Sequence, residues 1–235
     1  MSIADKLTTI AENEQKVYDK GVTDGRQAEY DEFWSDAFST LKDGYGGKHA
    51  FAGRCWNAKT FNPPPGTFIP YVCEGMFRES KIGDLAGIME RTGFTIKWSA
   101  TSYFDCMFIN ATITHIPVID LSSAIYVSQT FSSTAIKVID GIIFPSVARN
   151  FKTTFSNATA LEEISYIGGT IQGNITLSSC TKLNHDTIMR VINALYDYVA
   201  EGSTTTYTLT LGSTNLAKLT DEEKAIATQR GWTLA

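Results

Sequence analysis

Hydrophobic residues recur along the middle of the chain with a period near two dozen residues. Phenylalanine anchors stand at Phe108, Phe131 and Phe155, and Leu177 takes the same place in a fourth copy. Each anchor is followed five or six residues later by an aliphatic residue: Ile113, Ile136, Leu161 or Leu183. One such unit cannot bury its apolar side alone, whereas stacked copies form a continuous core. The pattern therefore predicts a short, irregular repeat solenoid.

The interior of each repeat has a second regularity. In the first three copies the apolar residues step by threes: Ile116 and Ile119, Ile139 and Ile142, Ile164 and Ile167. A small polar residue stands two positions after each anchor: Asn110, Ser133, Asn157, Ser179. We expect these side chains to bond backbone groups that a sharp turn leaves unpaired.

The segment 76–88 upstream of the repeats allows two interpretations. With Met76 as anchor and Ile82, Leu85 and Ile88 at matching places, it could form one more copy of the repeat. The same spacing suits an amphipathic helix, which is the favoured interpretation.

Signals for helix ends and strand alternation predict a cap after the repeats. A helix is expected from an N-cap at Asp186 to about Ala200, followed by a strand over 206–212. Thr220 and Glu223 have the spacing of a capping box, and Gly231 is a C-terminal stop before a last short strand. Such a cap would cover the end of the stack.

The first 45 residues are predicted to be a helical attachment or oligomerisation segment. Ile3, Leu7, Ile10 and Val17 fall on one narrow apolar stripe, which is marginal for a lone helix. The helix could pair with copies of itself as a coiled coil, dock on another protein, or fold back on its own domain. Three consecutive prolines predict an extended connector over 46–75. Residues 76–235 then form the repeat domain with its cap, and the fold class expected is α+β.

Composition narrows the classes of partner. The chain has 235 residues, 43% of them hydrophobic, and a formal net charge of −5 without a basic patch. These values are typical of a folded protein and argue against nucleic acid as the main partner. No apolar run approaches the ~18 residues of a membrane span, so no membrane insertion is expected. The N-terminus lacks the pattern of a signal peptide, so we expect synthesis in a cytoplasm.

The residue types that carry chemistry are scattered. His49, His115 and His185 are far apart and match no metal or nucleophile motif, and His115 is expected to be a structural or surface residue. Cys55, Cys73, Cys106 and Cys180 lack metal-type spacing and are predicted to be buried free thiols. We therefore expect no catalytic residues, no cofactor and no metal, and a protein that is not an enzyme.

Two features carry a resemblance to a known family. FINATITHIPVI, FSSTAIKVIDGI and FSNATALEEISYI resemble leucine-rich repeats of the BspA type, roughly F-x-x-C/N-x-x-L-x-x-I-x-I, although Cys180 alone occupies the usual cysteine place. Together with both chain ends, SIADKLTTIAENEQKVYDKG and KLTDEEKAIATQRGWTLA, they resemble small leucine-rich-repeat proteins encoded by phages and prophages of gut Firmicutes. The resemblance implies a virion protein, encoded among tail and other virion genes.

The resemblance implies a structural or adhesion role in the virion. The N-terminal helix would bind other virion proteins or form a homo-oligomer, and the repeat domain would bind a host-surface glycan or protein. Tyr103, Tyr126 and Tyr166 are candidate contacts, although each could instead be packed within the stack. The alternatives are a purely structural capsid decoration or tail protein, and a bacterial BspA-like surface adhesin, which needs an export route and a wall anchor.

Overall fold

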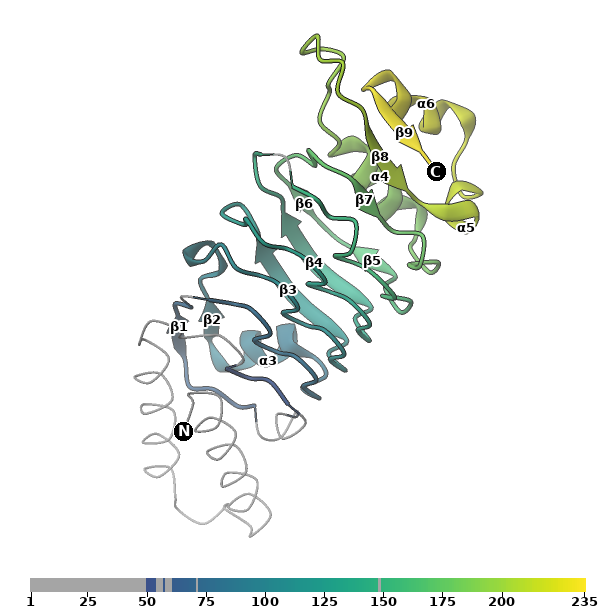
Figure 1. Cartoon of the computed structure of the whole chain (residues 1–235). Helices are drawn as coiled ribbons and strands as arrows, with labels where there is room; N and C mark the ends of the chain where they lie inside the picture. The colour runs from purple at the N-terminus through teal and green to yellow at the C-terminus, as the bar shows by residue number, and fades with distance from the viewer. Residues whose placement is uncertain (1–49, 54–56, 58–60, 71, 148) are drawn as a thin grey trace, which may run out of the picture.

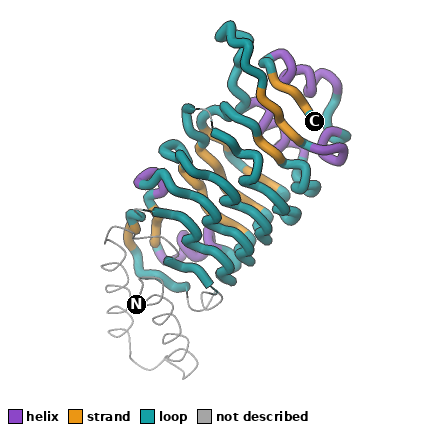
Figure 2. Tube along the Cα trace, viewed as in Figure 1, coloured by secondary structure: helices purple, strands orange, loops and turns teal. Residues whose placement is uncertain are grey.

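The computed structural model describes residues 50–53, 57, 61–70, 72–147 and 149–235. The predicted attachment helix over 1–45, with Ile3, Leu7, Ile10 and Val17, lies outside the described residues. The described chain combines short helices with short parallel strands, in agreement with the α+β prediction (Figure 1). Most of each turn of the chain is neither helix nor strand (Figure 2).

The strands form three small parallel sheets. The first pairs β1 (Gly66–Phe68) with β2 (Phe94–Ile96). In the second, β4 (Val138–Ile143) pairs with β3 (His115–Asp120) and with the two short strands β5 (Glu163–Ile164) and β6 (Ile167–Gly168). The third has the order β7 (Ile175–Thr176), β8 (Tyr207–Thr210), β9 (Trp232–Leu234). The helices are α3 (Leu85–Thr92), the 3-10 helix η1 (Trp98–Ala100), α4 (His185–Asn193), α5 (Gly212–Leu216) and α6 (Asp221–Gln229).

The register of the second sheet confirms the alignment of the repeats. Ile116 of β3 pairs with Ile139 of β4, which pairs with Ile164 of β5. Ile119, Ile142 and Ile167 match in the same way one step further on. Because parallel strands place equivalent residues side by side, a repeat of fixed length brings each apolar position onto its own copy.

The anchors form a buried column of stacked phenylalanine rings. Ring centroids lie 5.3 Å apart for Phe77 and Phe108, 5.7 Å for Phe108 and Phe131, and 5.1 Å for Phe131 and Phe155. All four side chains are buried, and so is Leu177, which continues the column. The core is therefore continuous from turn to turn.

The residue two positions after each phenylalanine anchor has a left-handed backbone conformation. Glu79, Asn110, Ser133 and Asn157 all have φ between 53° and 60°, the left-handed region in which a turn reverses sharply. The expected side-chain bonds are found at the fourth copy, where the Ser179 hydroxyl accepts from the Asn157 N–H at 3.1 Å and donates to the Phe155 carbonyl. For the first three copies, the described residues show no such bond from the polar side chain, so that part of the expectation is corrected.

The segment 76–88 divides between the two interpretations, since 76–84 forms one more turn of the stack and the favoured helix is wrong for these residues. Its anchor is Phe77, not Met76, because the Phe77 ring stacks on Phe108 at an interplanar angle of 7° and Glu79 has the left-handed turn. The favoured helix begins only at Leu85, with Asp84 as its N-cap and Gly93 as its left-handed C-cap. In the predicted connector, the described residues contribute Phe51, Phe61 and Phe68 to the core, together with strand β1.

The last turns change from strand to helix in a way that covers the open sheet edge. The N–H of Ile164 donates to the Thr187 hydroxyl, and the Ile164 carbonyl accepts from Arg190, both residues of α4. Two side chains of α4 thus make the hydrogen bonds to β5 that the backbone of a further strand would otherwise make. The N-cap of α4 is Asn184 rather than the predicted Asp186, and the helix ends at Asn193, earlier than expected.

The remaining cap elements match the sequence prediction. Thr220 and Glu223 form the capping box of α6, and Gly231 has the left-handed φ of a helix stop before β9. Buried Asn215 of α5 donates to the carbonyls of Leu177 and Cys180, which ties the cap to the last repeat. Among the described residues, none of the helices has the length and apolar character needed to span a membrane.

Candidate functional site: an exposed tyrosine pair and its flanking hollows

Two of the three candidate tyrosines meet on the surface. Tyr103 and Tyr126 precede the buried residues Phe104 and Val127 on successive turns and form a parallel β-bridge. Their rings stack with centroids 5.0 Å apart and planes 13° from parallel. Tyr103 is 44% exposed and Tyr126 is 47% exposed, so the alternative of tyrosines packed inside the stack is wrong for both.

Tyr166 lies elsewhere. It is 54% exposed and stands between β5 and β6, over two glycines of the second sheet. A Cβ atom on Gly141 or Gly168 would come within 3.1 Å or 2.9 Å of the Tyr166 side chain. The Tyr166 ring therefore covers glycines and forms no pair with Tyr103 or Tyr126.

A hollow adjoins Tyr126. Its lining comes from three successive turns and includes Asp105, Ile125, Ser128, Asn150 and Thr153. The Asp105 carboxylate accepts from the Ser128 N–H at 2.8 Å, and the hydroxyls of Ser128 and Thr153 are 3.2 Å apart. One aromatic side chain and several hydrogen-bonding groups thus share one open space.

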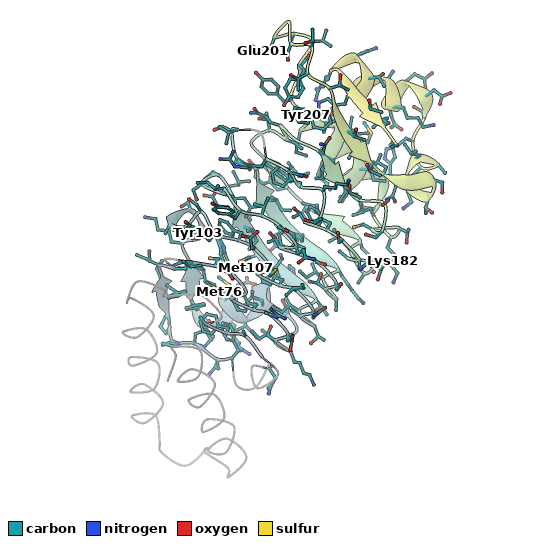
Figure 3. All side chains as sticks on the ribbon, viewed as in Figure 1. Met76, Tyr103, Met107, Lys182, Glu201 and Tyr207 are labelled. Carbon is teal, nitrogen blue, oxygen red and sulfur yellow. The ribbon has the colours of Figure 1, made fainter. Side chains whose placement is uncertain are left out.

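A second hollow lies on the other side of Asn150. It is lined by Arg149, Asn150, Gly173, Asn174 and Tyr207. The Asn174 amide oxygen accepts from the Thr208 N–H at 2.8 Å, which joins this turn to β8. The two hollows share Asn150, so they are adjacent on the stack. Figure 3 labels the side chains of Tyr103, the partner of Tyr126, and of Tyr207, which lines the second hollow.

Each hollow has one charged residue in its described lining, Asp105 in the first and Arg149 in the second. Partial burial raises the pKa of Asp105, the N–H of Ser128 lowers it, and the charge of Glu74 raises it, so that the net change is upward. The Asp105 carboxylate brings a negative charge to the first hollow at neutral pH. The other described residues that line this hollow are uncharged.

His115 lies between two carboxylates on the second sheet. Its Nδ1 is 3.0 Å from Asp84 and its Nε2 is 2.7 Å from Asp140. Burial lowers the pKa of His115, but the hydrogen bond and charge of Asp140, with those of Asp84, outweigh it and raise the pKa overall. The His115 ring thus joins residues of three turns, which agrees with the structural role expected of this histidine.

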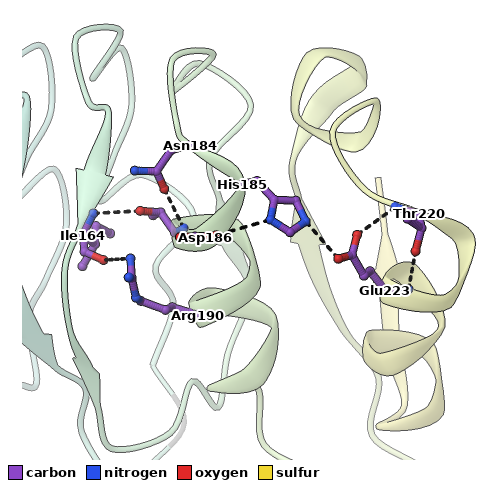
Figure 4. A network of polar contacts seen from close by, with 8 residues as sticks. Ile164, Asn184, His185, Asp186, Arg190, Thr220 and Glu223 are labelled. Atoms are coloured by element: carbon purple, nitrogen blue, oxygen red, sulfur yellow. Dashed lines mark hydrogen bonds and ion pairs between the residues drawn. The ribbon is translucent and has the colours of Figure 1, made fainter.

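His185 makes a similar link in the cap (Figure 4). Its Nε2 lies 2.9 Å from Glu223, the capping-box residue of α6, and its Nδ1 lies 3.5 Å from Asp186. Hydrogen bonds to Glu223 and then to Asp186 raise the pKa of His185. The arrangement ties α6 to α4, and the partners are surface groups.

The thiols fit the prediction of free cysteines in part. Cys73 and Cys180 are buried, Cys106 is partly exposed, and all three are free, while Cys55 lies outside the described residues. Burial raises the pKa of Cys180 to about 12 and that of Cys73 well above its usual value, which disfavours the reactive thiolate. Within the described ranges, no group of three or more His, Cys, Asp or Glu side chains could hold a metal ion.

Comparison of the chain with protein-family models, with curated proteins and with solved structures gave no match.

Proposed function

We propose that this chain is a non-enzymatic phage virion protein whose repeats form a short leucine-rich-repeat solenoid of the BspA type and bind the surface of a host cell. The observation that carries the proposal is the exposed, stacked pair of Tyr103 and Tyr126 beside hollows lined by polar side chains. Aromatic side chains at the surface supply much of the energy in binding sites when a ligand covers them.

The stability of the fold gives no reason for these two tyrosines to lie at the surface. The apolar core is complete beneath them in Phe104, Val127 and the phenylalanine column. Repeat stacks offer extended surfaces on which neighbouring turns contribute equivalent side chains to one ligand. An adhesion role uses such a surface, whereas a purely structural role would bury it against another virion subunit.

Attachment is assigned to the N-terminal segment on the sequence alone. The apolar stripe of Ile3, Leu7, Ile10 and Val17 would bind another virion protein or further copies of this chain. The repeat domain, at the other end of the chain, would then be free to meet the cell.

Two measurements test this proposal. Mass spectrometry and electron microscopy of purified phage particles from the bacterium that encodes the chain should locate the polypeptide at an exposed position in the virion. Soluble full-length protein should bind host cells and reduce phage adsorption. A chain present in the particle that neither binds cells nor competes with adsorption contradicts adhesion and leaves the structural role.

A further inference from the structure

We propose that the hollows on either side of Asn150 are consecutive subsites for an uncharged oligosaccharide, with the exposed ring of Tyr126 as the platform for one sugar ring. The inference rests on the proposed binding function and names the chemistry of its ligand.

The platform exists because the tyrosine column stops after two turns. Tyr103 and Tyr126 stand five residues before Phe108 and Phe131, and the residue five before Phe155 is Asn150. One face of the Tyr126 ring stacks on Tyr103, at 5.0 Å, and Tyr126 also lines the hollow shared with Asn150. An apolar ring face of that size suits the C–H face of a pyranose.

The polar groups around the first hollow are held in place by the backbone. The amide oxygen of Asn150 accepts from the Lys152 N–H at 2.9 Å, and Oδ1 of Asp105 accepts from the Ser128 N–H. These bonds fix both side chains, and within the described residues the NH₂ of Asn150 has no protein acceptor. The hollow therefore offers a donor from Asn150, an acceptor from Asp105 and hydroxyls from Ser128 and Thr153.

That mixture fits a polyol better than an anion or an apolar ligand. Each sugar hydroxyl donates and accepts a hydrogen bond, so a site needs both kinds of partner close together. The carboxylate of Asp105 repels a phosphate or a uronate, which lacks a proton to share with it. The described lining of this hollow contains no lysine or arginine that would favour an anion.

The second hollow also combines an amide with an aromatic residue, Asn174 with Tyr207, and its charged residue is Arg149, whose Nε donates to the Ala124 carbonyl at 3.0 Å. The Asn174 amide is fixed by the Thr208 N–H, and Tyr207 packs against Tyr198 at 5.2 Å and Trp232 at 5.8 Å. Turns in such a stack are spaced by about 4.8 Å, so Tyr126 and Asn174 are separated by roughly 10 Å. This distance suits a disaccharide or a longer chain with Asn150 between its two rings.

The test uses full-length protein and an array of neutral oligosaccharides, with uronate-bearing and phosphate-bearing glycans printed beside them. A neutral saccharide that binds is then titrated by calorimetry against four variants. Tyr126→Ala should weaken binding by about tenfold or more, as expected for an aromatic residue at the centre of a site, and Asn150→Ala by about fivefold. Tyr126→Phe, which keeps the ring, should recover most of the affinity that Tyr126→Ala loses. Tyr166→Ala, which removes the exposed tyrosine between β5 and β6, should leave affinity within about twofold.

The outcomes separate this inference from the function on which it rests. Cell binding without binding to any neutral saccharide, or binding only to the anionic glycans, overturns the sugar assignment and leaves adhesion standing. Loss of saccharide binding in Tyr166→Ala but not in Tyr126→Ala overturns the location. Absence of both cell binding and saccharide binding contradicts the inference and the proposed function together. Melting temperatures of the variants near that of the unchanged protein show that each loss is local.

Discussion

The repeats build two aromatic columns that share a stacking geometry and differ in exposure. Phe108 and Phe131 stack at 5.7 Å and 11°, and Tyr103 and Tyr126 stack at 5.0 Å and 13°. Both phenylalanines are at most 1% exposed, whereas both tyrosines are more than 40% exposed. The buried column removes apolar area from water and stabilises the fold, while the tyrosine pair leaves much of its area exposed, as the proposed binding role requires. The same stacking of aromatic rings between neighbouring copies is thus buried at one position of the repeat and exposed at another.

Truncation of one ring in each column gives the strongest test of the difference between the buried and the exposed column. Phe131→Ala should lower the free energy of unfolding by about 3–5 kcal/mol, because it opens a cavity between Phe108 and Phe155. Tyr126→Ala should cost about 1 kcal/mol, since the ring is half exposed. Urea unfolding followed by circular dichroism measures both. Equal losses would mean that the tyrosine pair is part of the core.

A pair of glycines tests how closely the turns approach one another. Gly169 and Gly202 both have left-handed backbone, with φ of 70° and 67°. A Cβ on Gly169 would lie 2.2 Å from the Phe144 carbonyl oxygen, whereas one on Gly202 meets nothing within 4 Å. Gly169→Ala should therefore cost about 3 kcal/mol, and Gly202→Ala about 1 kcal/mol. Similar melting temperatures for the two variants would contradict the close approach at Gly169.

The left-handed turns allow a smaller test at an exposed position. Gln129 has φ of 56° two residues after buried Val127. Gln129→Gly should stabilise the protein by about 0.5 kcal/mol, because glycine adopts this conformation without strain, and Gln129→Val should destabilise it by about 1 kcal/mol. Denaturant midpoints of the two variants decide the point, and a change of the same sign in both would refute it.

The pH dependence of His115 gives the smallest expected effect. Its pKa in the folded protein is raised by Asp140 and Asp84 above the ordinary 6.5, against the opposing effect of burial. The stabilisation is therefore complete below pH 6.5 and is lost as the pH rises through the higher folded pKa. His115→Asn should make stability depend less on pH in this window, and the imidazole resonances in NMR should titrate above pH 6.5. A folded pKa below 6.5 would rule out the link between the turns.

The spacing of the apolar residues was enough to predict how the repeats align, but not the anchor of the upstream copy or the N-cap of α4. The register of Ile116, Ile139 and Ile164 followed from the repeat length, because parallel strands align equal positions. The anchor of the upstream copy was placed one residue early, since Met76 and Phe77 are both buried and either could fill an inward position. The N-cap of α4 was misplaced because Asn184 and Asp186 are both good caps, and the bond from the Thr187 N–H to Asn184 decides between them.

The candidate site was partly predictable. The tyrosines were singled out as aromatic residues between core positions, yet only Tyr103 and Tyr126 share a place in the repeat, five residues before an anchor. This shared distance of five residues from an anchor was the signal in the sequence that Tyr103 and Tyr126 would pair and that Tyr166 would not join them. Asn150 holds the same place and borders both hollows, but a polar residue in a turn carries no sign of its role until the neighbouring turns are in position.

The central claim is that the tyrosine pair serves binding and the phenylalanine column serves the fold. The most direct measurement is the binding of full-length protein to host cells, with the double variant Tyr103→Ala, Tyr126→Ala compared with Tyr166→Ala. We predict that the double variant loses binding while its melting temperature stays within a few degrees of the unchanged protein, and that Tyr166→Ala keeps both. Full binding by the double variant, or its loss together with the fold, would contradict the account.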